Sequence, residues 1–176
     1  MGAAGGHMMF NQFRTKQFRS LIAVAITAAP LLVSIGAFPV AAGGVKELAG
    51  RWSGWGAVKL SNGATEQVKC VATYFVKNSG ARINQNLRCA NSSYKIDAKA
   101  HYNVNGAALT GEWEERTHSA KGNVLGRVTD DGFRLSVKGE TFSANMIVTS
   151  SRCKQQISIS PKGLNVARIS IGLRKC

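Results

Sequence analysis

The feature that most constrains the fold of this chain is an alternation of apolar and polar residues with a period of two. Between Tyr94 and Val104 every second residue is apolar or aromatic, and the residues between them are polar or charged. The same alternation runs through residues 133–138, 156–160 and 167–174. Successive side chains of a β-strand point to opposite faces, so each run predicts a strand with one buried face.

Turn signals separate these runs. Asn62-Gly63, Asn105-Gly106 and Asp131-Gly132 are typical of tight hairpins, because both residues tolerate a positive φ. Slightly longer reversals are predicted at residues 78–80, 121–123 and 161–163. Together the signals predict ten strands, over residues 51–60, 64–77, 82–90, 93–104, 107–117, 123–129, 132–139, 141–150, 153–160 and 164–175.

Consecutive hairpins with short connections predict an all-β, antiparallel up-and-down meander. One apolar face per strand requires the sheet to close into a small β-barrel, or alternatively to fold into a β-sandwich. An outer-membrane barrel is disfavoured, because it needs apolar side chains outward and aromatic girdles, while aromatic residues are 7% of the chain.

The N-terminus has the features of an export signal. Three basic residues, Arg14, Lys16 and Arg19, precede an apolar stretch over residues 21–38. The small residues Ala41 and Ala42 follow this stretch, as at a signal-peptidase cleavage site. We therefore predict a cleaved signal peptide over residues 1–42, a single barrel domain over residues 43–176, and a periplasmic or secreted location. A retained membrane anchor is the alternative, because the apolar run approaches the roughly 18 residues that span a bilayer.

Four cysteines follow this segment, an even number that predicts disulfides in an oxidising compartment. A hairpin centred on Ser79 places Cys70 opposite Cys89, within disulfide reach. Cys153 and Cys176 pair by elimination. Since a reversal at residues 161–163 places Cys153 nearer Ile171, the C-terminal residues are expected to bend back to close this second bridge.

The segment Gly50-Arg51-Trp52 opens the first predicted strand, and a second Gly-x-Trp lies at Gly111-Glu112-Trp113. The first resembles the opening of lipocalins and avidin-like barrels. That resemblance implies that Trp52 plugs one end of a barrel, with Arg168 or Arg174 over its ring. As a whole, the chain resembles uncharacterised small exported alphaproteobacterial proteins through its first strand and residues 87–90 and 157–161, which implies an envelope location and no known activity.

Small residues on the predicted inner face, among them Ala98 and Ala100, leave room for an apolar ligand or else fit a tapering, packed core. The first reading predicts a non-catalytic binding protein that holds a small apolar molecule or lipid in the barrel or at its mouth. The residues predicted to contact this ligand are Trp52, Tyr94, Ile96, Ala98, Ala100, Tyr102, Trp113 and Met146.

The chain is strongly basic, with 23 Lys+Arg against 9 Asp+Glu. No nucleic-acid-binding signature accompanies this charge, and no nucleic-acid partner is predicted. The alternative function is therefore a structural or interaction protein that binds a protein partner or an anionic envelope component, such as lipopolysaccharide, phospholipid headgroups or an acidic glycan. The residues predicted to form its anionic-surface site are Lys95, Lys99, Arg152, Lys154, Arg174 and Lys175.

Catalytic patterns are weak. His101 and His118 lie outside any recognisable nucleophile or metal motif, so neither an enzyme activity, a metal nor a cofactor is predicted. Glu112 and Glu114 share the face opposite Trp113, whereas Glu115 shares the side of Trp113 and is expected to point into the barrel mouth. Glu115 is thus the carboxylate with most claim to a chemical role.

Overall fold

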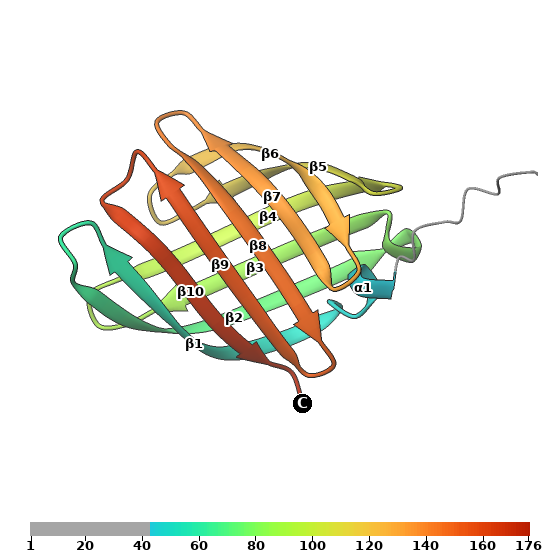
Figure 1. Cartoon of the computed structure of the whole chain (residues 1–176), viewed down its shortest axis with the longest axis horizontal. Coiled ribbons are helices and arrows are strands. Elements are labelled where there is room, and N and C mark those ends of the chain that lie inside the picture. Colours follow the sequence, from blue (N-terminus) through green and yellow to red (C-terminus); the bar gives the residue numbers. More distant parts are fainter. Residues whose placement is uncertain (1–42) are drawn as a thin grey trace, which may run out of the picture. The chain divides into compact units, whose positions relative to one another are not determined.

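The computed structural model describes residues 43–176, and the predicted signal peptide lies outside the described residues. Ten strands follow a short helix, α1, and a single 3-10 turn, η1, interrupts them (Figure 1). The elements are α1 (Gly43–Lys46), β1 (Gly50–Leu60), β2 (Thr65–Lys77), η1 (Asn78–Gly80), β3 (Arg82–Ala90), β4 (Lys95–Asn105), β5 (Ala108–Glu115), β6 (Ala120–Thr129), β7 (Gly132–Gly139), β8 (Ser143–Ser151), β9 (Lys154–Lys162) and β10 (Val166–Arg174).

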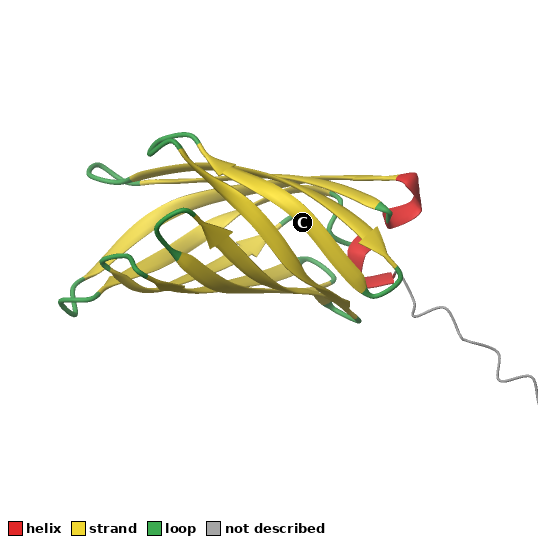
Figure 2. Ribbon diagram, turned by 90° about the horizontal axis from the view of Figure 1, so that it is seen from above, coloured by secondary structure: helices red, strands yellow, loops and turns green. Residues whose placement is uncertain are grey.

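Each strand pairs antiparallel with its neighbours in sequence, and β1 also pairs with β10 to close the barrel. This closure confirms the predicted meander and excludes the sandwich (Figure 2). The two ends differ. We call the end that carries α1 and the turns after β2, β4, β6 and β8 the α1 end. The end that carries the turns after β1, β3, β5, β7 and β9 is the mouth end.

Apolar side chains point inward along all ten strands and form one core, which includes Trp52, Phe133 and Ile157. Outward positions are mainly polar or basic, the reverse of the pattern that outer-membrane barrels require. Within residues 43–176, no helix has the length and apolar character needed to cross a membrane.

The reversal predicted at residues 121–123 is wrong, because these residues lie inside β6. Gly122 is paired there with Trp113 on β5 and with Gly139 on β7. A Cβ atom at Gly122 would overlap the carbonyl oxygen of Lys138, so the glycine permits close strand contact rather than a turn. The actual β5–β6 turn covers residues 116–119.

Both predicted disulfides are present. Cys70 on β2 lies directly opposite Cys89 on β3, as the hairpin register predicts. Cys153 bonds to Cys176, but the predicted register of the last hairpin is wrong. Arg174 lies opposite Lys154, so the reversal is centred on Leu164 and Cys153 faces the C-terminal residues without any backward bend.

Candidate functional site

A cavity of about 490 Å³ occupies the mouth half of the barrel. Its wall is mostly aliphatic and aromatic, and residues from the turns after β3, β5, β7 and β9 surround its opening. Seven of the eight predicted ligand-contact residues line it: Tyr94, Ile96, Ala98, Ala100, Tyr102, Trp113 and Met146. The eighth, Trp52, is absent from the wall because it is buried at the α1 end.

Small side chains create this space. Ala98 and Ala100 point inward from β4, and Ala144 points inward from β8. Larger side chains occupy the inward positions opposite them, such as Leu87 opposite Ala98 and Trp113 opposite Ala100. Ten tilted strands enclose a wider interior than eight, so these alanines leave a cavity rather than a packed core.

A chain of buried polar side chains begins at the cavity floor, where Tyr102 and Gln85 line the cavity, and continues behind it. The Tyr102 hydroxyl donates to Gln85 Oε1 at 2.6 Å, and Gln85 Nε2 donates to the Tyr74 hydroxyl at 3.1 Å. Tyr74 in turn donates to Gln155 Oε1 at 3.2 Å, and Gln155 Nε2 donates to Ser150 Oγ at 3.0 Å. Within residues 43–176, no buried side-chain nitrogen or oxygen lacks a hydrogen-bond partner.

Burial raises the pKa of both Tyr74 and Tyr102 far above the ordinary value, so these phenols remain neutral donors. The floor is therefore polar but uncharged. Sequence reasoning missed Gln85 and Gln155, although both occupy inward positions of the alternation where apolar residues are expected. An inward glutamine was the available signal, since a buried amide requires partners.

Aromatic side chains surround the opening. The Trp113 and Phe142 rings pack edge to face with centroids 5.3 Å apart, and Trp113 Nε1 donates to the carbonyl oxygen of Lys138 at 3.4 Å. The rings of Tyr94 and His118, in the turns after β3 and β5, lie 6.4 Å apart at the same rim. The entrance thus combines apolar ring surface with polar ring atoms.

Glu115 lines the cavity, as predicted, but both oxygens of its carboxylate accept hydrogen bonds from backbone groups of β4 and of the β5–β6 turn. Oε1 accepts hydrogen bonds from the backbone N–H groups of Asp97 and Thr117, at 2.8 and 2.9 Å. Oε2 accepts from the N–H of His118 at 2.8 Å and contacts His118 Nδ1 at 2.7 Å. Burial alone would raise the pKa of Glu115, but these hydrogen bonds more than offset it and lower the pKa to about 2.

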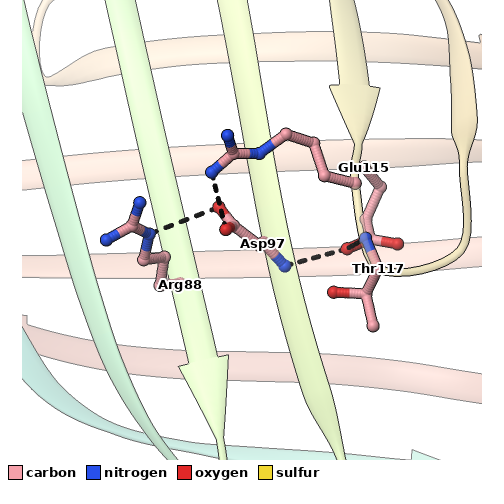
Figure 3. Close-up of polar contacts among 5 residues, drawn as sticks. Arg88, Asp97, Glu115 and Thr117 are labelled. Carbon is pink, nitrogen blue, oxygen red and sulfur yellow. Dashed lines mark hydrogen bonds and ion pairs between the residues drawn. The ribbon is translucent and has the colours of Figure 1, made fainter.

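Asp97 extends this cluster to the outer surface of β4 (Figure 3). Its carboxylate accepts from Arg88 Nε at 3.3 Å and from Arg116 Nη2 at 2.7 Å. Burial opposes ionisation of Asp97, but the two guanidinium groups prevail and lower its pKa. The cluster therefore ties β3, β4 and the β5–β6 turn together beside the mouth, which positions the cavity rim.

Trp52 closes the α1 end. Its indole Nε1 donates to the carbonyl oxygen of Leu48 at 2.7 Å, and Lys175 Nζ lies 4.7 Å from the ring centroid. The expectation that Arg168 or Arg174 covers the ring is wrong, because both are exposed at outward positions of β10. Lys175, just beyond the strand, turns inward instead and donates to the carbonyl oxygen of Glu47 at 2.6 Å.

The six residues predicted to form the anionic-surface site do not form one patch. Three of them lie at the α1 end: Arg152, Lys154 and Arg174. Lys175 lies at the same end, with its ammonium group over the Trp52 ring. Lys95 and Lys99 lie on β4, across the barrel, where Lys99 is opposite Glu114 and also contributes to the cavity wall.

A second, polar hollow of about 450 Å³ lies outside the barrel over β4, β5 and β6. His101, Glu112 and Asn123 occupy facing positions there, and His101 Nδ1 is 3.0 Å from Asn84 Oδ1. Within residues 43–176, no three His, Cys, Asp or Glu side chains converge as a metal site requires.

The structure thus defines a ten-stranded antiparallel β-barrel with one internal apolar cavity. No family model and no curated protein matches the chain. A similar solved structure is a protein of unknown function from the DUF3598 family of Nostoc punctiforme, with a TM-score of 0.45 and 11% identity. The match covers 75% of this chain and 49% of that protein, so the chain spans about half the length of that neighbour.

Proposed function

We propose that this chain is an exported, non-catalytic binding protein of the bacterial envelope, which holds a small apolar molecule or lipid in the barrel. The observation that carries this proposal is the cavity of about 490 Å³ behind an aromatic rim. Its volume lies within the roughly 300–1,000 Å³ of pockets that hold small molecules.

The wall is mostly apolar, which supports an apolar or weakly polar ligand, and its charged side chains are Lys99 and Glu115. The one carboxylate on the wall, Glu115, already accepts hydrogen bonds on both oxygens. The floor presents the neutral phenol of Tyr102 and the amide of Gln85, whose groups are bonded to each other. An apolar ligand would therefore displace water from this wall without breaking a protein hydrogen bond.

Two further observations agree with this proposal. The Gly50-Arg51-Trp52 opening, on which the lipocalin resemblance rests, places a buried tryptophan at the end opposite the cavity mouth. Two disulfides agree with export into an oxidising compartment.

Native mass spectrometry tests the proposal. The full chain is exported through an oxidising compartment and purified without detergent. We expect an adduct that is lost on collisional heating, and saturable uptake of the uncharged fluorescent probe N-phenyl-1-naphthylamine with quenching of Trp113.

A matched pair of variants places the probe. Ala144→Phe fills the cavity and should abolish uptake, whereas Ala108→Phe adds the same ring at an exposed, outward position of β5 and should leave uptake unchanged. Absence of both an adduct and probe uptake, or equal loss in the two variants, would contradict the proposal.

A further inference from the structure

Basic residues lie at outward positions of most strands, whereas the outward acidic residues gather on β4 and β5, so other faces of the barrel carry positive charge alone. The outward positions of β10, β1 and β2 carry six basic and no acidic residues, whereas those of β4, β5 and β6 carry four basic and three acidic. We call the first set the Trp55 face. Its basic residues are Arg51, Lys59, Lys69, Lys77, Arg168 and Arg174.

This charge is uncompensated. Within residues 43–176 the ion pairs involve Asp97 with Arg88 and Arg116, and Glu115 with His118, so none engages the Trp55 face. The six like charges are therefore spread along this face without a carboxylate partner, and two of them, Lys59 and Arg168, lie directly opposite each other. Such a surface attracts an anionic partner and repels a second copy of itself.

Trp55 lies at the centre of this face and is 63% exposed. Its cross-strand neighbour on β2 is Lys69, while its neighbour on β10 is Gly172, which has no side chain to cover the indole. Phe75, also on β2, is 50% exposed. This tryptophan contributes nothing to the core, and tryptophan is a residue type enriched at interfaces, where one part of the ring is apolar and its N–H remains solvated.

The strand register surrounds this indole with cations. Arg174 is two residues beyond Gly172 on β10, so it lies diagonal to Trp55, and Lys59 lies opposite Arg168 further along the same pair of strands. Diagonal neighbours in a sheet are about 7–8 Å apart, within reach of long side chains. An aromatic ring with cations on both sides thus faces outward.

We propose that the Trp55 face docks on the surface of a bilayer that contains anionic phospholipids. Lysine and arginine side chains bind the phosphates of such a surface, and tryptophan prefers the level of the headgroups, where its apolar ring and its N–H are both accommodated. The proposal is independent of the cavity, because no outward side chain of this face is part of the cavity wall.

Vesicle co-sedimentation tests the proposal, with protein exported as above and shown by its mass to lack the predicted signal peptide. We expect binding to vesicles of phosphatidylcholine with about one third phosphatidylglycerol, no binding to phosphatidylcholine alone, and loss of binding as salt rises. Emission from Trp55 should shift to the blue on binding, because the indole leaves water.

Two double charge-reversal variants distinguish an effect of the Trp55 face from an effect of the net charge of the protein. Lys69→Glu with Arg168→Glu alters the Trp55 face, and Arg127→Glu with Arg134→Glu makes the same change in net charge on facing, exposed positions of β6 and β7. We expect the first pair to lower vesicle affinity by about tenfold or more and the second by less than about twofold. Equal losses would overturn the assignment to this face.

Trp55→Ser tests the aromatic component. We expect a several-fold loss of affinity with an unchanged dependence on salt, and loss of the blue shift. The far-UV circular dichroism and the denaturant midpoint of each variant verify that the barrel is folded. Unchanged affinity in Trp55→Ser, or tight binding of a soluble acidic polysaccharide that prevents vesicle binding without a blue shift, would overturn the proposal.

Discussion

The two ends of this barrel are formed by the same strands but differ in packing, because the α1 end is closed and the mouth end contains a cavity. At the α1 end, α1 contacts η1 and the ends of β6 and β7, and Trp52 is fully buried behind it. At the mouth end, Phe142 and Tyr94 border an open cavity instead of meeting in a core. The comparison indicates that the α1 end supplies stability, while the mouth end is built to remain open.

Buried polar side chains connect these halves. The hydrogen-bond chain runs from Tyr102 and Gln85, which line the cavity, through Tyr74 to Gln155 and Ser150 near the turn after β8. A fully bonded buried network favours one arrangement of the surrounding side chains. The floor can therefore stay in place whether or not the cavity is filled.

The largest expected effect is at the α1 end. Trp52→Ala removes a fully buried indole, its hydrogen bond to Leu48 and the contact with Lys175, and should lower the free energy of unfolding by about 4 kcal/mol. Denaturant unfolding measures this loss. Trp113→Ala at the mouth is the control and should cost less than half as much, because that indole is half-buried beside empty space. Equal costs would refute the division of roles.

The second disulfide gives the next effect. Replacing Cys153 and Cys176 with Ser opens a link over a sequence separation of 23 residues, which should cost about 3 kcal/mol in the chain-entropy model. Denaturant midpoints of the wild-type and double-Ser proteins measure this difference. Since the bond lies at the α1 end, uptake of the cavity probe at low temperature should be retained. Loss of uptake in a folded variant would show that the two ends are coupled.

Much of this architecture could be predicted from the sequence because alternation is a local signal. Seven of the predicted ligand-contact residues line the cavity, and five of these follow from the inward alternation of residues 94–104. The register of the β2–β3 hairpin likewise predicts the Cys70–Cys89 bond. In both cases the information lies within one strand or one hairpin. Trp52 and Trp55 are an odd number of residues apart, so the same rule places them on opposite faces, a signal that our sequence analysis did not use.

The errors lie where particular side-chain contacts decide the outcome. The β5–β6 turn falls at residues 116–119 because Glu115 binds the backbone there, whereas Gly122 looks like a turn residue and instead permits strand contact. The cation over Trp52 is Lys175 because the chain leaves β10 at the α1 end. Neither result follows from spacing, because the turn depends on side-chain hydrogen bonds and the Lys175 contact depends on where the closed barrel places the end of β10.

Glu115 allows the mouth end to be perturbed by pH. Its pKa is lowered from 4.5 to about 2, so its ionised form stabilises the fold above pH 4.5, and this contribution is lost as the pH falls towards 2. Glu115→Gln should cost about 1.5 kcal/mol at neutral pH, near the lower value for hydrogen bonds to a charged group. Unfolding between pH 6 and pH 2 measures the difference, which should shrink through this range. A constant difference would show that the carboxylate charge is not involved.

The smallest effect concerns the cation over Trp52. Lys175→Met keeps the aliphatic stem but removes the ammonium group, its position 4.7 Å from the ring centroid and its bond to Glu47, and should cost about 0.5–1 kcal/mol. Lys154→Met is the control, because Lys154 is exposed at the same end and makes no contact with Trp52. Since both variants lower the net charge by one, a larger loss for Lys175→Met isolates the local contact. Equal values would mean that the indole closes the α1 end by burial alone, with the lysine as a surface charge.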